Sequence, residues 1–204
     1  MALYVLAFTD SAIRDAALQI VEIDGIFAVC WRRGAVPEAT DETLRRQHQA
    51  VLEIARRASA ILPVRFGALI GKDELLERMR SHEEVLRRAL DEVRNRVQMT
   101  MRVLGTAPRP EPVHVSSGRQ YLEERRRALD PVLPSGAQAI VEAVRPLTIR
   151  ERLEPGAAGM LATIYHLIPA TDASAYTAAA ASMSSSNVIV SGPWPPFAFT
   201  PQLW

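Results

Sequence analysis

The chain has 204 residues, of which 48% are hydrophobic and 23% charged, and its formal net charge is +1. This composition is typical of a globular protein with one large domain or two small ones. The nearly neutral charge argues against nucleic-acid binding driven by charge, because the neutralisation of phosphates needs a surplus of basic residues.

Cysteine content and hydropathy indicate the cellular location of the protein. Cys30 is the only cysteine, so no disulfide can form within the chain, and a reducing environment is expected. The first ten residues lack the basic start of a signal peptide. No apolar run reaches the roughly 18 residues that a membrane-spanning helix needs. We therefore expect a cytoplasmic protein with neither a nucleic-acid nor a membrane partner.

The first 95 residues are predicted to form an α+β domain. Apolar, β-prone runs predict strands at 3–8, 18–23 and 26–31. Asp24-Gly25 predicts a hairpin between the last two, because a type I′ turn needs a positive φ at both central residues. A further strand is expected within 60–71, where Pro63 requires it to be short, bulged or at an edge.

Two helices are predicted in the same domain. Asp41 is expected to cap the first helix, which runs to about Ser59, and Asp73 is expected to cap the second. Their apolar faces follow the helical period. The first face consists of Leu44, His48, Val51, Ala55, Ala58 and Leu62. The second consists of Leu76, Met79, His82, Leu86, Leu90 and Val93.

At residue 96 the hydrophobic period changes from 3.6 to 2, as Val97, Met99, Met101 and Val103 alternate with polar residues. The elements expected from here on are a strand at 97–103, helical segments at 116–130 and 135–144, strands at 146–153 and 159–168, a helix at 172–183, and a strand at 187–192. This βαββαβ order is that of a ferredoxin-like domain. Residues 96–192 are assigned to it, and 193–204 to a Pro- and aromatic-rich tail packed on the body.

The chain offers little for catalysis. Its four histidines are His48, His82, His114 and His166, and no two have the spacing of metal ligands on one element. No phosphate-binding loop and no serine-centred turn occurs, so we expect no enzyme, no cofactor and no metal. The alternative is a ligand-responsive or enzymatic domain around His48 and His82, which meet if their helices pack together.

Three stretches together resemble one family. "LPVRFG" (62–67), "SGRQYLEERRR" (117–127) and "GPWPPFAF" (192–199) occur in the order typical of the GvpF/GvpL family of gas vesicle accessory proteins. The resemblance implies a non-enzymatic role in gas vesicle assembly, in the cytoplasm and at the vesicle. The implied partners are the small hydrophobic shell protein and other accessory proteins, and some members are minor shell components. The resemblance also implies an N-terminal α+β domain followed by a modified ferredoxin-like domain.

The tail has two interpretations. Trp194, Phe197 and Phe199 either fold back on the protein as a clasp or remain available to a partner. Pro193 and Pro196 form a PxxP motif, and such segments dock into aromatic grooves of other domains.

Two other places are candidate contact sites for a partner. Arg65 and Phe66 of "LPVRFG" either have a structural role, with Arg65 in a buried ion pair or at a helix end, or contact the partner. Arg150 and Arg152 lie on the polar face of a predicted edge strand, where charge deters self-pairing. A partner strand added to a sheet edge would mask the apolar surface of a shell subunit.

Overall fold

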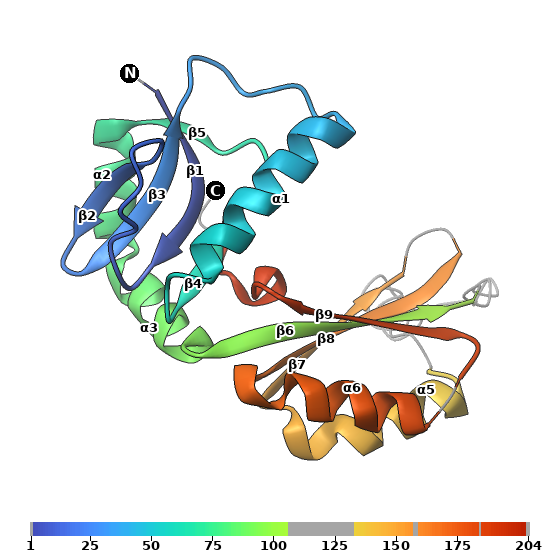
Figure 1. Cartoon of the computed structure of the whole chain (residues 1–204). Helices are drawn as coiled ribbons and strands as arrows, with labels where there is room; N and C mark the ends of the chain where they lie inside the picture. The colour runs from blue at the N-terminus through green and yellow to red at the C-terminus, as the bar shows by residue number, and fades with distance from the viewer. Residues whose placement is uncertain (1, 106–132, 157–158, 184, 203–204) are drawn as a thin grey trace, which may run out of the picture. The chain divides into compact units, whose positions relative to one another are not determined.

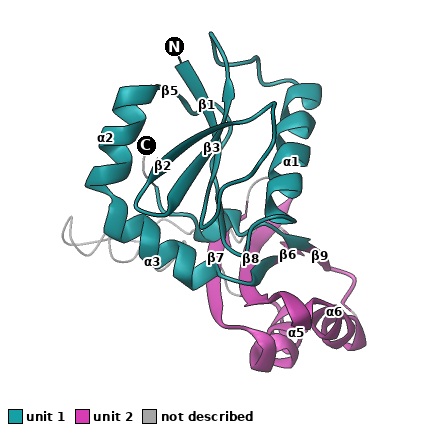
Figure 2. Cartoon of the chain, turned by 60° about the vertical axis from the view of Figure 1, so that its left-hand side comes forward, with its two compact units in different colours: residues 1–98, 193–204 teal, residues 99–192 magenta. Residues whose placement is uncertain are grey.

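The computed structural model describes residues 2–105, 133–156, 159–183 and 185–202. The helix predicted at 116–130 lies outside these residues. The chain divides into two compact units: unit 1 comprises residues 1–98 and 193–204, and unit 2 comprises residues 99–192 (Figure 2). Helices and strands occur in both, so the protein is of the α+β type. The predicted division at residue 95 stays a prediction.

Unit 1 is built on an antiparallel sheet (Figure 1). Its strands are β1 (Ala2–Thr9), β2 (Gln19–Ile23), β3 (Ile26–Arg32), β4 (Ile61–Pro63) and β5 (Leu69–Gly71). The order is β2-β3-β1-β4, and β5 also pairs with β1. After its first residue β1 is buried throughout, because helices cover both faces of the sheet (Figures 1 and 2).

The hairpin between β2 and β3 is confirmed. Asp24 and Gly25 have φ values of 45° and 77°, the two positive φ angles that a type I′ turn requires. Pro63 ends the three-residue strand β4, which lies at one end of the sheet order. The expectation of a short edge strand at Pro63 is therefore confirmed as well.

The first helix, α1 (Asp41–Ala55), differs from the prediction in its cap and in its buried face. Its N-cap is Thr40, not Asp41, and Thr40 and Thr43 form a reciprocal capping box. The buried side chains are Gln47, Val51 and Ile54, whereas Leu44 is 43% exposed. The predicted stripe is confirmed at Val51, Ala55 and Ala58 but wrong at Leu44, and it missed the polar residue Gln47 on the core side.

The second predicted helix is in fact two helices, α2 (Lys72–Ser81) and α3 (Glu83–Val93). They are separated at His82, where φ is −118° and ψ is 16°. Gly71 is the N-cap of α2, so the expected cap by Asp73 was wrong. The buried side chains of the two helices are Leu75, Met79, Leu86, Ala89, Leu90 and Val93.

Unit 2 contains a four-stranded sheet in the order β7-β8-β6-β9. The strands are β6 (Arg96–Leu104), β7 (Arg150–Pro155), β8 (Met160–Pro169) and β9 (Val188–Trp194), and the chain passes between the units within β6 and β9. The described helices are α5 (Ser135–Val144) and α6 (Ala173–Ser182), both on one face of the sheet (Figure 1). Met99, Met101 and Val103 of β6 are buried as predicted, but Gln98 and Thr100 of the predicted polar face are buried too, so burial does not alternate along the strand.

Strand β7 begins later than predicted. Residues Arg145–Leu147 form a 3-10 turn that contains Pro146, and the extended segment starts at Arg150. The strand was also expected to be half-buried, but the side chains of residues 150–153 are all exposed. Strand β7 lies at one end of the sheet order among the described strands.

Candidate interaction site

The C-terminal tail lies against its own unit. The ring centroids of Trp194 and Phe197 lie 5.7 and 6.3 Å from that of His48 on α1. Phe199 is 6% exposed, and the backbone N–H of Ala198 donates to Gln98 Oε1 at 2.8 Å. These contacts, all within unit 1, favour the clasp interpretation.

The prolines of the tail argue in the same direction. Pro193 is exposed, but Pro195 and Pro196 are buried. A PxxP ligand presents both of its prolines to an aromatic groove of the partner. With Pro196 buried, this segment does not present the motif in the structure described.

The "LPVRFG" motif carries the chain from β4 towards β5. Val64 is buried and its N–H donates to the carbonyl of Leu6 at 2.8 Å. The ring of Phe66 meets Tyr4 edge-on, with 6.0 Å between centroids. Arg65 is exposed, so the expected buried ion pair was wrong. Phe66 therefore packs inward, while the Arg65 side chain faces solvent.

A buried polar network fixes this motif to the sheet. The hydroxyl of Tyr4 donates to Gln47 Oε1 at 2.6 Å and accepts from the N–H of Gly67 at 2.8 Å. Gln47 Nε2 in turn donates to the carbonyl of Val64 at 3.1 Å. Burial raises the pKa of Tyr4, so the phenol stays protonated. The periodicity of α1 gave no sign of this network, because Gln47 reads as a surface residue.

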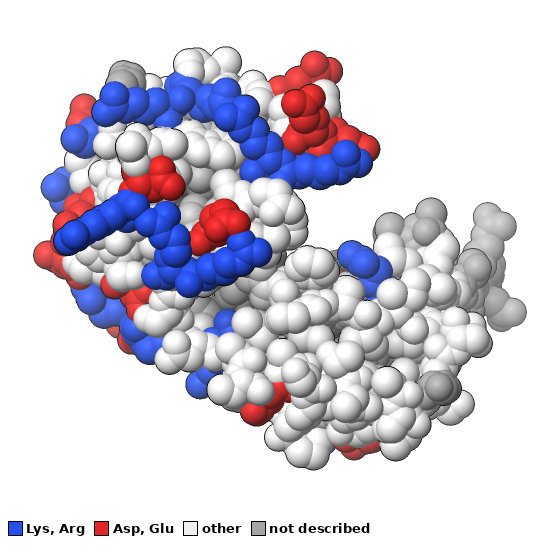
Figure 3. All heavy atoms as spheres, viewed as in Figure 1, with Lys and Arg blue, Asp and Glu red and all other residues white. Residues whose placement is uncertain are grey.

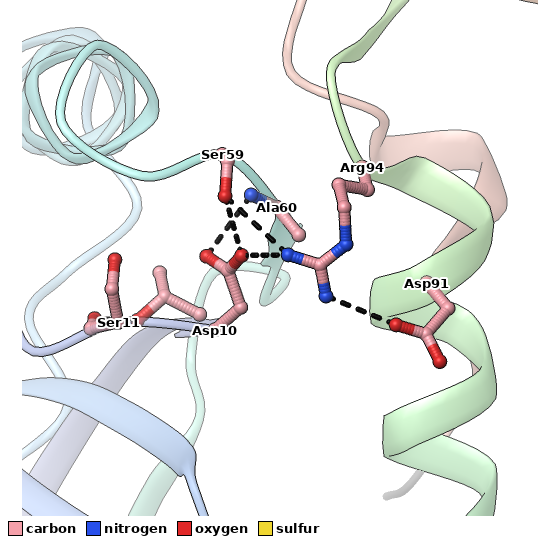
Figure 4. Close-up of polar contacts among 7 residues, drawn as sticks. Asp10, Ser11, Ser59, Ala60, Asp91 and Arg94 are labelled. Atoms are coloured by element: carbon pink, nitrogen blue, oxygen red, sulfur yellow. Dashed lines mark hydrogen bonds and ion pairs between the residues drawn. The ribbon is translucent and has the colours of Figure 1, made fainter.

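A second polar cluster lies where β1 ends (Figure 4). Asp10 accepts hydrogen bonds from Ser59 Oγ at 2.5 Å and from the N–H of Ala60 at 3.1 Å, and it pairs with Arg94. Arg94 also reaches Asp91 at 3.0 Å. Burial alone would raise the pKa of Asp10, but the bonds from Ser59, Ala60 and Arg94 outweigh it and lower the pKa. The cluster joins three segments and has a structural role.

Unit 2 contains a buried histidine. His166 is 1% exposed, and its Nδ1 lies 2.6 Å from the hydroxyl of Tyr176 while its Nε2 lies 3.0 Å from Glu151 Oε2. Burial lowers the pKa of His166 and outweighs the opposite effect of Glu151. Burial also raises the pKa of Tyr176. This chain of three groups connects β7, β8 and α6, and sequence reasoning missed it because its members lie far apart in sequence.

The two ends of the unit 2 sheet differ in charge. Strand β7 carries the exposed candidates Arg150 and Arg152, and Arg152 pairs with Glu154 at 2.8 Å. In contrast, residues 173–204 contain no Asp, Glu, Lys or Arg, so α6 and β9 are uncharged. Met183 and Ile189 in this stretch are 44% and 48% exposed. On the face shown in Figure 3, unit 2 is mostly uncharged, while charged side chains gather on unit 1.

The described part of the chain contains no group of three or more His, Cys, Asp or Glu residues that could hold a metal ion. Cys30 is buried, and its burial raises the pKa of the thiol to about 12. His82 Nδ1 lies 2.9 Å from the carbonyl oxygen of Arg78, whereas His48 contacts the tail rings. No described helix is long and apolar enough to cross a membrane.

Comparison with known proteins defines the class. The described residues contain an uncharged stretch from Ala173 onward, which includes α6 and the edge strand β9. A family model described as "Gas vesicle synthesis protein GvpL/GvpF" matches residues 2–201. The chain therefore belongs to the GvpL/GvpF family. No curated protein shows significant sequence similarity to it.

Two solved structures have a similar fold. The crystal structure of the gas vesicle protein GvpF from Anabaena sp. PCC7120 has a TM-score of 0.74 and 16% sequence identity, covering 98% of this chain and 96% of that one. The crystal structure of GvpF from Microcystis aeruginosa also has a TM-score of 0.74, with 12% identity, covering 98% and 99% of the two chains. At these identities the likeness shows a shared fold.

Proposed function

We propose that this protein is a non-enzymatic gas vesicle accessory protein that binds the small hydrophobic shell protein and assists vesicle assembly, as a cytoplasmic factor or a minor shell component. Membership of the GvpL/GvpF family supports the gas vesicle context. The observation that carries the binding proposal is the uncharged surface of α6 and β9. Other accessory proteins of the vesicle are further proposed partners.

The physical argument concerns exposed apolar surface. A shell subunit before assembly exposes an apolar patch large enough to aggregate. A partner surface without charges can cover such a patch without removing ions from water. Met183 and Ile189 supply exposed apolar side chains for this contact.

The edge of the sheet supplies a second component. An unpaired strand edge binds an extended segment through main-chain hydrogen bonds. Native edges are normally protected by charge, as Arg150 and Arg152 protect β7. Strand β9 ends the sheet order without any charged residue. We therefore place the shell protein at β9 and assign Arg150 and Arg152 a protective role at β7.

The domain layout belongs to the same proposal. We propose that residues 96–192 form a ferredoxin-like domain, which is supported by the strand order β7-β8-β6-β9 and by the two helices on one sheet face. We further propose that residues 193–204 are a clasp on unit 1. Trp194, Phe197 and Phe199 then have a structural role and do not contact the partner.

Co-expression with the shell protein tests the proposal. A tag on this chain should capture the shell protein, and Ile189→Glu should abolish capture. Ile149→Glu is the matched control, because Ile149 is 46% exposed beside the opposite edge of the same unit. If Ile189→Glu still captured the shell protein and Ile149→Glu did not, the contact would lie at β7 instead. Failure of the wild-type chain to capture the shell protein or any other vesicle protein would overturn the function.

No observation favours the alternative of a ligand-responsive domain around His48 and His82. Each histidine has its own local contacts, with the tail rings and with Arg78 respectively. Replacing both with Gln is expected to leave vesicle formation intact. A loss of vesicles with folding preserved would favour the alternative.

A further inference from the structure

We infer that unit 1 carries a binding site for an acidic peptide segment, formed by the indole of Trp31 and the guanidinium groups of Arg33 and Arg46. A cavity of about 410 Å³ lies here, lined by Trp31, three arginines and the short side chains of Ala16 and Ala17. Its volume falls in the range of natural ligand pockets. The site lies in unit 1, whereas Met183 and Ile189 lie in unit 2, and it is independent of the function proposed above.

Three positive charges meet at this cavity. The guanidinium carbons of Arg33 and Arg46 lie 5.5 and 5.7 Å from the centre of the Trp31 ring. Arg32, which also lines the cavity, donates to the neutral amide oxygen of Gln19. Within the described parts of the chain, none of the three forms an ion pair with a carboxylate. The cavity therefore has a positive potential that attracts an anionic group.

Other arginines of unit 1 are paired differently. On its helices and at their C-caps, described arginines form ion pairs with acids one turn away, as in Arg45–Asp41, Arg56–Glu53, Arg78–Glu74, Arg87–Glu83, Arg88–Glu84 and Arg94–Asp91. Arg46 directly follows Arg45, yet its guanidinium lies over an indole. The arrangement at Trp31 thus leaves the planar donor forks of Arg33 and Arg46 free for a carboxylate, which they match in geometry.

The floor of the cavity is held in place before any ligand binds. Trp31 stacks on the buried ring of Tyr4, with 6.1 Å between centroids and 22° between planes. Tyr4 is itself fixed by Gln47, which neighbours Arg46 on α1. A preformed site loses less entropy when it binds a ligand.

The opposite wall is also anchored. Asp15 accepts a hydrogen bond from the N–H of Ala17 at 2.9 Å and pairs with Arg57 at 3.5 Å. Leu18 packs against the hydrophobic core cluster. The two alanines leave room beside the indole, so an aliphatic side chain next to the carboxylate can pack on the Trp31 face. An alternating acidic and apolar peptide fits this combination of charge and apolar surface.

The experiment uses Trp31 fluorescence in the full chain with Trp194→Phe and Trp204→Phe, so that Trp31 is the only tryptophan. The probe is an acetylated, amidated hexapeptide of alternating Glu and Leu. The peptide is expected to change the Trp31 fluorescence saturably. Its affinity should fall as the salt concentration rises, because salt screens the charges. The same peptide with Gln in place of Glu should bind at least about tenfold more weakly, because charge-assisted bonds are lost.

Variants identify the residues that carry binding. Arg33→Gln and Arg46→Gln should each weaken binding about tenfold. Arg45→Gln is the matched control, because it removes the same charge from the neighbouring position and should change affinity less than about twofold. Unchanged melting temperatures would show that all three variants fold.

Several outcomes would overturn the inference. They are no Trp31 response at millimolar peptide, equal binding of the Gln peptide, or equal effects of Arg45→Gln and Arg46→Gln. Saturable binding of inorganic phosphate or AMP without binding of the peptide would show an anion site of another class and would also overturn it. Capture of the shell protein is a separate readout, so failure here leaves the proposed function untouched.

Discussion

The two units have a similar architecture but differ in the charge of their surfaces. Both combine an antiparallel sheet with helices, but unit 1 has several ion pairs, a buried polar network around Tyr4 and a more exposed one around Asp10. Unit 2 has a buried network at His166, and from Ala173 onward its residues carry no charge. Charged and polar contacts therefore join the segments of unit 1, whereas unit 2 lacks charged side chains from Ala173 onward, and this difference underlies the proposal that a partner binds there.

The largest expected effect concerns the tail of unit 1. Phe199→Ala should lower the free energy of unfolding by about 3–5 kcal/mol, because it leaves a cavity where a buried ring was. Pro193→Ala, at an exposed position, should change it by less than about 0.5 kcal/mol. Urea unfolding measures both. Equal, small effects would mean that the tail does not hold unit 1 together.

Two variants that each lack one buried hydroxyl allow the polar networks of the two units to be compared. Tyr4→Phe leaves Gln47 Oε1 and the Gly67 N–H without their partner, and should cost about 1–3 kcal/mol. Tyr176→Phe leaves only His166 Nδ1 without its partner, and should lower the free energy of unfolding by less. Thermal unfolding of the two variants tests this order. A larger loss for Tyr176→Phe would contradict the view that unit 1 depends more on its buried polar groups.

Acid should weaken the units at different pH. The folded pKa of His166 is lowered, so the unfolded chain binds the proton more readily, and stability is lost as pH falls below about 6.5. The folded pKa of Asp10 is also lowered, but its contribution persists until pH falls below about 4. Hydrogen exchange at pH 7 and 5.5 should therefore show loss of protection in unit 2 before unit 1.

A variant that lacks His166 is the control for this pH dependence. His166→Gln should flatten the loss between pH 6.5 and 5, because Gln does not titrate. Asp10→Asn should leave that range unchanged and should reduce the loss below pH 4. An unaltered profile in His166→Gln would assign the acid sensitivity to other groups.

The smallest expected effect on stability concerns the edge strand β9. Ile189→Lys should change the free energy of unfolding by less than about 0.5 kcal/mol, since the side chain is 48% exposed. The same change should reduce concentration-dependent self-association, because charge blocks edge pairing. Sedimentation of the wild type and of Ile149→Lys gives the comparison. Self-association reduced only by Ile149→Lys would identify β7 as the vulnerable edge.

Much of the fold follows from local sequence signals. The Asp24-Gly25 turn and the short strand at Pro63 each have a local steric cause, and the structure confirms them. The errors in unit 1 have a tertiary cause. Gln47 faces the core because Tyr4 and Val64 offer it partners from elsewhere in the chain.

The candidate sites were harder to predict. That Phe66 packs on Tyr4 and Phe197 on His48 depends on segments far apart in sequence. The same holds for the His166 cluster and for the cavity at Trp31. The absence of charged residues in 173–204 is visible in the sequence. Its connection with a sheet edge could be seen only from the sheet order, which places β9 at an edge.

The central claim is that unit 2 receives the shell protein on its uncharged surface. Its most direct test is residue-level photo-crosslinking in cells that co-express the shell protein. A photoreactive residue at Met183 or Ile189 should crosslink to the shell protein, while one at Leu44 or Val85, similarly exposed on unit 1, should not. Crosslinks from Leu44 or Val85 alone, with none from Met183 or Ile189, would contradict the account.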